Sequence, residues 1–203
     1  MTFSIYQLKP RFQQLLSPLL DGLARNHVTP NQITLCAMIL SLGYGAALAV
    51  TPHSMALWLG LPVFLLFRMA LNAIDGMLAN ATGSKTRLGA ILNEMGDQVS
   101  DLALTLPLAC VMSAPLVVLL AVLALLAEFA GVLAISIGSP RRFDGPMGKS
   151  DRAFALGVLA LMIWAGARPA AVNGVLALVI ALTLWTVLNR LRRALRFCAP
   201  PTR

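Results

Sequence analysis

The sequence predicts an all-α integral membrane protein with six transmembrane helices and an N-terminal interfacial amphipathic helix. Composition is the first reason: 58% of the 203 residues are hydrophobic and 12% are charged, whereas soluble domains carry about 25% charged residues. Six apolar segments of about the length that spans a bilayer are the second. Positive charge gathered at the ends of these segments is the third. The length suits one membrane domain covering residues 1–203.

The first expected element is the interfacial helix, over residues 3–25. Its apolar residues recur at helical spacing, and Lys9, Arg11 and Arg25 fall elsewhere on the helical wheel. The segment is too polar to cross a membrane, and Pro10 and Pro18 interrupt a single long helix. It is therefore expected to lie on the membrane surface.

Six spanning helices are expected after it, because each segment approaches the roughly 20 apolar residues that a span requires. Their approximate ranges are 31–50, 55–78, 88–112, 115–137, 152–167 and 170–191. Most connections are short, so helices that follow one another in the chain are expected to be antiparallel neighbours.

Positive charge falls on alternate sides of these spans. One side carries only Arg168, in the connection before the last span. The other side carries the cations of the N-terminal segment, two connections and the C-terminal tail: Lys9, Arg11, Arg25, Lys85, Arg87, Arg141, Arg142, Lys149, Arg152, Arg190, Arg192, Arg193, Arg196 and Arg203. The positive-inside rule therefore predicts that both termini are cytoplasmic. Because these cations flank apolar spans, they indicate contact with lipid headgroups and not with nucleic acid.

Acidic side chains at membrane depth are the unusual feature of the chain. Each buried carboxylate costs about 2.5–3.5 kcal/mol even on insertion scales, yet Asp75, Glu94, Asp97, Asp101 and Glu128 all fall in or beside expected spans. At about 100° per residue, the acids of the third span share one face with Asn93. On the second span Arg68, Asn72 and Asp75 likewise form one polar stripe.

Two interpretations of these stripes stay open. Clustered carboxylates repel one another unless a cation lies among them, and oxygen ligands suit Mg²⁺, Mn²⁺ or Ca²⁺. Alternatively, Arg68 neutralises two of the acids in an internal ion-pair network, with Glu128 and Asp101 as candidate partners. The second interpretation does not explain the small residues Gly76 and Gly89 beside the acids, although small residues are also common where membrane helices pack.

The spacing of these residues resembles the signature of the CDP-alcohol phosphotransferase family. That signature is Asp-x-x-Asp-Gly-x-x-Ala-Arg, eight residues, then Gly-x-x-x-Asp-x-x-x-Asp. The chain has Asn72-x-x-Asp75-Gly76-x-x-Ala79-Asn80, eight residues, then Gly89-x-x-x-Asn93-x-x-x-Asp97. The stretch Val-Thr-Pro-Asn-Gln-Ile-Thr at residues 28–34 resembles the start of the first span in that family.

The resemblance implies a bacterial inner-membrane enzyme that transfers a phosphatidyl group from CDP-diacylglycerol to a small alcohol and releases CMP. It implies a homodimer and a bound Mg²⁺ or Mn²⁺. Asp97 would be the general base and a metal ligand. The other metal ligands would be Asp75, Asn72 and Asn93, and Asn72, Gly76, Ala79, Asn80 and Gly89 would line the nucleotide site.

The chain departs from the signature at three positions. Asn72 and Asn93 replace aspartates, and Asn80 replaces the arginine. Glu94 and Asp101 are candidates for the missing negative charge, and Lys85 and Arg87 are candidates for the missing cation. A rearranged two-metal site, a single-metal site and an inactive descendant all stay open.

The basic connection after the fourth span is a candidate site for a phosphate on the acceptor. Lys149 and Arg152 lie at the start of the next helix, where phosphate binding is common. Arg141 and Arg142 are secondary candidates, since topology and lipid headgroups explain both of them better. Two rival functions remain: a non-catalytic relative that binds a CDP-lipid or scaffolds a synthase, and an ion-coupled transporter. Against the transporter, the chain shows no inverted repeat.

Overall fold

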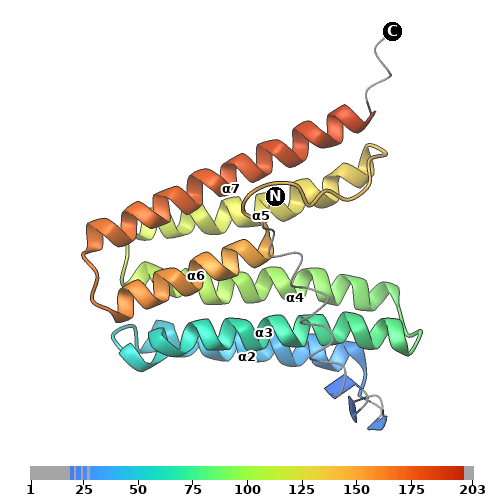
Figure 1. The fold of residues 1–203 in the computed structure, drawn as a ribbon, viewed down its shortest axis with the longest axis horizontal. Coiled ribbons are helices and arrows are strands. Elements are labelled where there is room, and N and C mark those ends of the chain that lie inside the picture. The colour runs from blue at the N-terminus through green and yellow to red at the C-terminus, as the bar shows by residue number, and fades with distance from the viewer. Residues whose placement is uncertain (1–18, 21, 24, 27, 199–203) are drawn as a thin grey trace, which may run out of the picture. The chain divides into compact units, whose positions relative to one another are not determined.

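The computed structural model describes residues 19–20, 22–23, 25–26 and 28–198, and its long elements are all helices. The expected interfacial helix, 3–25, lies almost entirely outside the described residues. In chain order the elements are α2 (Pro30–Val50), α3 (Met55–Ala81), α4 (Arg87–Thr105), the 3₁₀ helix η2 (Leu106–Cys110), α5 (Ala114–Ser136), α6 (Lys149–Trp164) and α7 (Pro169–Cys198), as Figure 1 shows.

The six α-helices correspond to the six expected apolar segments, and only two of their ends differ by more than three residues from the expected ones. The third was expected to continue to residue 112 but ends as an α-helix at Thr105. Pro107, in the first turn of η2, lacks the N–H that an α-helix would use there, and its ring crowds the preceding turn. The last helix continues past residue 191 to Cys198, through a basic amphipathic end.

Four of the described helices are long and apolar enough to cross a bilayer: Pro30–Val50, Met55–Ala81, Ala114–Ser136 and Pro169–Phe197. Their outward faces support this assignment, because large apolar side chains such as Val118, Val122 and Phe129 on α5 are exposed. α4 carries the polar stripe, and α6 has only 16 residues, so neither meets the same criterion. Six crossings therefore remain a prediction for these two helices.

The start of α2 is fixed by a reciprocal pair of hydrogen bonds. The Thr29 N–H donates to the side-chain oxygen of Gln32 at 2.9 Å, and the Gln32 N–H donates to the Thr29 hydroxyl at 3.3 Å. This is a capping box, and Pro30 occupies the first helical position, where its missing N–H costs nothing. The Thr-Pro-Asn-Gln sequence thus sets where α2 begins and which side chains of its first turns face inward.

The chain forms two compact units, and the first consists of Met1–Tyr44 and Leu66–Asp101. Within it, the first part of α2, the second part of α3 and most of α4 come together. Ile33, Ile74 and Leu78 form its small apolar core, against which Leu71 packs. The polar stripes of α3 and α4 belong to this unit.

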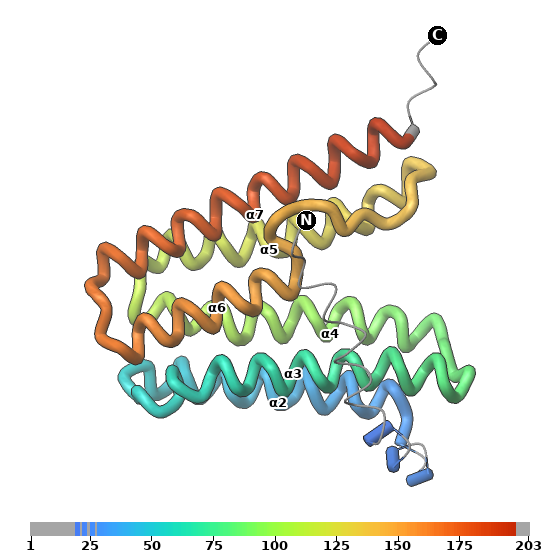
Figure 2. Tube along the Cα trace, in the orientation of Figure 1, coloured from blue at the N-terminus to red at the C-terminus, as the bar shows by residue number. Residues whose placement is uncertain are grey.

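The second unit consists of Gly45–Leu65 and Leu102–Arg203. In it, α5 packs along α7, and α6 also contacts α7. The connection between α5 and α6 folds back along α5, as the trace in Figure 2 shows, and the Arg142 N–H donates to the Gly131 carbonyl at 3.1 Å. Glycine is required at this point, since a Cβ on residue 131 would lie 2.6 Å from the Arg142 carbonyl oxygen.

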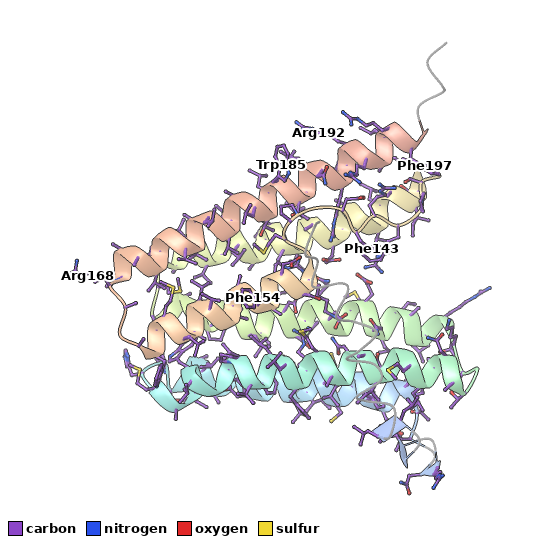
Figure 3. All side chains as sticks on the ribbon, in the orientation of Figure 1. Phe143, Phe154, Arg168, Trp185, Arg192 and Phe197 are labelled. Atoms are coloured by element: carbon purple, nitrogen blue, oxygen red, sulfur yellow. The ribbon has the colours of Figure 1, made fainter. Side chains whose placement is uncertain are left out.

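Cations lie at both ends of α7, and Figure 3 shows Arg168 and Arg192 toward its opposite ends. Arg168 stands in the connection before the helix, whereas Arg190, Arg192, Arg193 and Arg196 all lie in its C-terminal part. The Arg192 guanidinium also lies 5.7 Å from the centre of the Trp185 ring, an arrangement typical of a helix end at a membrane–water interface.

Close helix packing in the second unit yields a stability prediction. A Cβ on Gly45 would overlap the carbonyl oxygen of Ala103, whereas a Cβ on Gly43, on the same helix, would meet nothing within 4 Å. Overpacking costs about 1–3 kcal/mol, so we expect Gly45→Ala to lower the melting temperature in detergent by about 4 °C or more. Gly43→Ala is the matched control and should melt at or above the wild-type temperature. Equal melting temperatures for the two variants would contradict the close approach.

Candidate functional site

The first unit brings together the two aspartates that the signature spacing singled out. Asp75 is on α3 and Asp97 is on α4, and each receives a hydrogen bond from an asparagine of the other helix. The Asn72 amide nitrogen donates to Asp97 Oδ1 at 2.8 Å, and the Asn93 amide nitrogen donates to Asp75 Oδ2 at 3.2 Å. The four signature positions on these helices therefore form one polar cluster, which we call the Asp75–Asp97 site.

A third helix contributes a residue to this site. The Thr34 hydroxyl, on α2, donates to Asp75 Oδ2 at 2.8 Å, and Thr34, Asp75 and the core around them are almost fully buried. Thr34 was not predicted as a residue of this site. Its place at the end of the Thr-Pro-Asn-Gln-Ile-Thr stretch is a local signal, but nothing in that stretch shows that its partner is Asp75, 41 residues away.

Arg68 joins the α4 end of the site. Its guanidinium donates to Asp101 Oδ1 at 2.6 Å and to the Asp97 carbonyl oxygen at 3.1 Å. The nitrogen that donates to the Asp97 carbonyl also lies 3.6 Å from Asp97 Oδ1. Arg68 is 4% exposed, so this ion pair is poorly screened by water. Arg68 therefore neutralises Asp101, as one of the two interpretations expected. Glu128, the other suggested partner of Arg68, is paired with arginines of the second unit.

The two signature glycines serve different purposes. A Cβ on Gly89 would lie 2.9 Å from Asn31 Oδ1 and 3.1 Å from the Thr86 hydroxyl, so this glycine lets α4 begin close to α2. A Cβ on Gly76 would meet nothing within 4 Å. Gly76 is exposed and directly follows Asp75, so helix packing within the described residues does not account for it.

The remaining predicted residues of this unit lie around the aspartates at various depths. Ala79 and Glu94 are half-buried, whereas Asn80 near the end of α3, Lys85 in the connection and Arg87 at the start of α4 are exposed. That connection turns at Gly83, whose φ of +62° is one that glycine adopts without strain. The assignment of these five residues to a nucleotide or metal site stays a prediction.

The donor atoms of the site suit a hard divalent cation, but only with the asparagines included. In the part of the chain that the structure describes, no group of three His, Cys, Asp or Glu side chains is placed to hold a metal ion. Asp75 and Asp97 supply two carboxylates, and the amides of Asn72 and Asn93 supply two more oxygens within the same cluster. Mg²⁺ and Mn²⁺ accept carboxylate and amide oxygens together. The residues therefore fit a divalent cation, provided that each amide turns its oxygen toward it.

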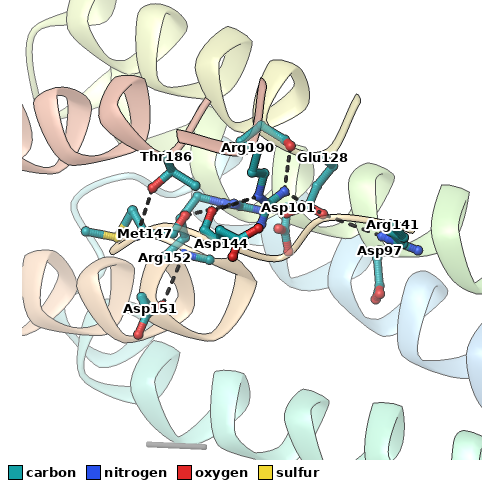
Figure 4. Close-up of polar contacts among 12 residues, drawn as sticks. Asp97, Asp101, Glu128, Arg141, Asp144, Met147, Asp151, Arg152, Thr186 and Arg190 are labelled. Atoms are coloured by element: carbon teal, nitrogen blue, oxygen red, sulfur yellow. Dashed lines mark hydrogen bonds and ion pairs between the residues drawn. The ribbon is translucent and has the colours of Figure 1, made fainter. Parts of the chain in front are cut away.

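A second buried cluster, which we call the Glu128 cluster, lies in the second unit (Figure 4). The Glu128 carboxylate, on α5, is 3.1 Å from Arg152 of α6, 3.3 Å from Arg190 of α7 and 3.6 Å from Arg141 of the connection. Arg190 also donates to the Ala127 carbonyl at 2.5 Å. Three guanidinium groups therefore surround the Glu128 carboxylate, which is itself buried.

The connection between α5 and α6 is held over this cluster by Asp144. Its carboxylate lies 2.7 Å from Arg142 and 2.8 Å from Arg193. The Met147 N–H donates to the Thr186 hydroxyl at 2.9 Å, and the Gly148 N–H donates to Asp151, as Figure 4 also shows.

Among the predicted acceptor-binding residues, Arg152 and Arg141 belong to the Glu128 cluster, whereas Arg142 holds the connection through Asp144. Lys149 is half-buried at the first position of α6. Arg190 was not predicted to belong to the Glu128 cluster, because it lies among several arginines at the end of α7 whose presence topology alone explains. Its burial, at 2% exposed, is what separates it from its neighbours.

Comparison with known proteins agrees with the signature spacing. Residues 27–188 match the family described as CDP-alcohol phosphatidyltransferase. The chain is 45% identical to the inner membrane protein YnbA of Escherichia coli over 199 residues, covering 97% of this chain and 98% of YnbA. It is 36% identical over 90 residues to the phosphatidylinositol phosphate synthase of Mycobacteroides abscessus, covering 44% of this chain and 39% of that protein.

The fold is also similar to solved structures. The phosphatidylinositol phosphate synthase of Mycobacterium tuberculosis with CDP-DAG bound superposes with a TM-score of 0.75 at 20% identity, covering 89% of this chain and 94% of that one. The same enzyme in complex with manganese and citrate gives a TM-score of 0.74 at 21% identity, covering 88% of each chain. With the family match over most of its length, this chain belongs to the CDP-alcohol phosphatidyltransferase family.

Proposed function

We propose that the protein is a divalent-metal-dependent transferase that moves a phosphatidyl group from CDP-diacylglycerol to an alcohol and releases CMP. The observation that carries this proposal is the convergence of Asp75 and Asp97, from adjacent helices, at the signature positions of the family. The structures of the M. tuberculosis synthase with CDP-DAG and with manganese support the choice of donor and of cation.

Each side chain of the site has its own role in the proposed reaction. A bound Mg²⁺ or Mn²⁺, held by Asp75, Asp97 and the asparagine oxygens, would neutralise charge on the pyrophosphate oxygens. Asp97, whose side chain is 17% exposed, accepts the proton of the acceptor hydroxyl as general base. Arg68 holds Asp97 through its backbone carbonyl and Asp101 through its carboxylate, and so fixes the direction of the base. Gly76, which is exposed and has no side chain, would leave room for the nucleotide.

We propose further that the acceptor alcohol carries a phosphate group, which the Glu128 cluster binds together with Lys149. Arg141, Arg152 and Arg190 outnumber the single carboxylate between them, and arginine forms paired hydrogen bonds with phosphate. The names of the relatives in Mycobacteroides and Mycobacterium point to a phosphorylated alcohol as well.

The protein is proposed to lie in the bacterial inner membrane as a single six-span domain with cytoplasmic termini, and to form a homodimer. YnbA, the relative that aligns over almost the whole chain, is an inner membrane protein. α6 is short for a span, but the connection before it carries Arg141 and Arg142. If α4 and α6 did not cross, this basic connection would face away from the cytoplasm, against the positive-inside rule.

A second candidate function, a non-catalytic CDP-lipid-binding relative or scaffold, is favoured by one observation. The Asn72 and Asn93 amides each donate a hydrogen bond to one carboxylate of the site, which reduces the need for a cation there. A protein that had lost turnover could keep such a site for stability alone. Nucleotide binding with no CMP release from any acceptor, in the presence of Mn²⁺, would select this function over the transferase.

The role of Asp97 can be tested by Asp97→Asn, which removes the general base but preserves shape. We expect CMP release from CDP-diacylglycerol by purified protein with Mn²⁺ to fall by about 10²–10⁴-fold, the usual contribution of general-base catalysis. Asp151→Asn is the matched control, because it loses one carboxylate in the same way while the asparagine oxygen can still accept the hydrogen bond from the Gly148 N–H. If Asp97→Asn keeps normal turnover while Asp101→Ala abolishes it, the base has been assigned to the wrong residue.

Phosphate recognition can be tested by Arg141→Gln, the member of the Glu128 cluster that is most exposed. Loss of one charged hydrogen bond costs about 1.5–3 kcal/mol, so we expect KM for phosphorylated acceptors to rise by about tenfold or more. KM for unphosphorylated alcohols should not change. Arg196→Gln, on the exposed end of α7, is the control for loss of one positive charge. An equal rise in KM for both classes of acceptor would argue against a phosphate site.

The number of spans can be tested with single cysteines in a chain whose native cysteines are replaced. Phe143 is the informative position, because it is exposed in the connection between α5 and α6. With six spans, a cysteine at 143 reacts with an impermeant thiol reagent from the same side as one at Lys85, and from the side opposite to one at Arg168. With four spans, a cysteine at 143 reacts from the side of Arg168.

A further inference from the structure

The two asparagines that replace signature aspartates are arranged reciprocally across the helix pair. Asn72 of α3 donates to Asp97 of α4, and Asn93 of α4 donates to Asp75 of α3. The orientation of both amides follows from chemistry, since an ionised carboxylate only accepts hydrogen bonds and must face the NH₂ end of an amide. Each substituted position thus binds the retained aspartate of the opposite helix.

These hydrogen bonds reduce the repulsion between the clustered side chains, which a bound cation would otherwise offset. Four aspartates in this arrangement would repel one another in a poorly hydrated place, and a divalent ion would be required to hold α3 and α4 together. Two amides remove two negative charges and supply a donor to each remaining carboxylate. The amides thus relieve part of the repulsion that a cation would otherwise have to offset.

The same arrangement opposes cation binding. To offer its oxygen to a cation, each amide must turn about its terminal bond and give up the hydrogen bond to the opposite aspartate. An amide oxygen also brings no charge to the cation, and ligand charge is one of the properties that set affinity for hard divalent ions.

From this geometry we infer that Asn72 and Asn93 form an amide lock, which makes the fold of the first unit independent of metal and sets a weak divalent-cation affinity. The lock acts on the same Asp75–Asp97 site as the proposed function and rests on that function for its catalytic consequence. In this protein the occupancy of the site, and hence turnover, follows the free Mg²⁺ or Mn²⁺ concentration. A four-aspartate site would instead stay filled.

The test is to restore the aspartates by Asn72→Asp, Asn93→Asp and the double change. We expect Mn²⁺ affinity, measured by the electron paramagnetic resonance of free Mn²⁺, to rise about tenfold for each carboxylate. In EDTA the double variant should melt about 5 °C or more below wild type, and Mn²⁺ should restore it. The wild-type melting temperature should change by less than about 2 °C between EDTA and Mn²⁺. The double variant is purified in Mn²⁺ and then dialysed, so that folding itself is not in question.

Asn173→Asp is the matched control for the added charge. Asn173 lies in the second unit and accepts a hydrogen bond from the Ser113 N–H at 3.3 Å, which an aspartate accepts equally well. This variant should keep wild-type Mn²⁺ affinity and metal-independent melting. Unchanged affinity in the double variant, or equal melting with and without metal, would overturn the amide lock.

Failure of the inference and failure of the proposed function give different results. If wild type releases CMP but the three variants bind Mn²⁺ no more tightly than wild type, the lock is wrong and the transferase stands. If no protein releases CMP while the double variant gains metal affinity and metal-dependent melting, the lock stands and the scaffold replaces the transferase.

Discussion

The structure of the first unit depends on how two carboxylates are accommodated between apolar helices. Asp75 is 3% exposed, and its hydrogen-bond partners Thr34 and Asn93 are neutral side chains from two other helices. A buried carboxylate without such donors would cost several kcal/mol. The position of α2 against α3, and of α3 against α4, therefore follows from the requirement that these donors reach Asp75 and Asp97. The capping box at Thr29 and the absence of a side chain at Gly89 allow α2 and α4 to approach closely enough.

In the second unit, a buried carboxylate is stabilised by charged side chains. Glu128 lies among Arg141, Arg152 and Arg190, so its burial is offset by ion pairs and not by neutral donors. The two clusters differ in their chemistry. The Asp75–Asp97 site is rich in carboxylate and amide oxygens, which suit a cation. The Glu128 cluster is rich in guanidinium groups, which suit an anion. The proposed transferase, acting on a pyrophosphate and a phosphorylated alcohol, would use both kinds of site.

Helical periodicity was enough to predict much of this arrangement. A turn of about 100° per residue placed Asn72 and Asp75 on one face of α3, and Asn93 and Asp97 on one face of α4, as the hydrogen bonds confirm. The signature spacing predicted the family, which the match over residues 27–188 confirms. Partners that are distant in the sequence could not be predicted, because spacing within a helix says nothing about which other helix approaches. Thr34 and Arg190 were missed for that reason, and the early end of α4 was missed because Pro107 was counted only as an apolar residue.

A structural role alone is a weak explanation for Asp75 and Asp97. Buried ionic and polar clusters can often be replaced by apolar side chains of similar volume with no loss of stability, or with a gain of about 1–4 kcal/mol. If α3 and α4 needed only to pack against each other, small apolar residues, which are common where membrane helices pack, would stabilise the pair better. The amides at Asn72 and Asn93 make the retained carboxylates tolerable without metal, and yet they do not remove them. The Asp97 side chain is also partly exposed, at 17%. Two carboxylates kept at this cost, one of them accessible, are best explained by a substrate or cation that binds them.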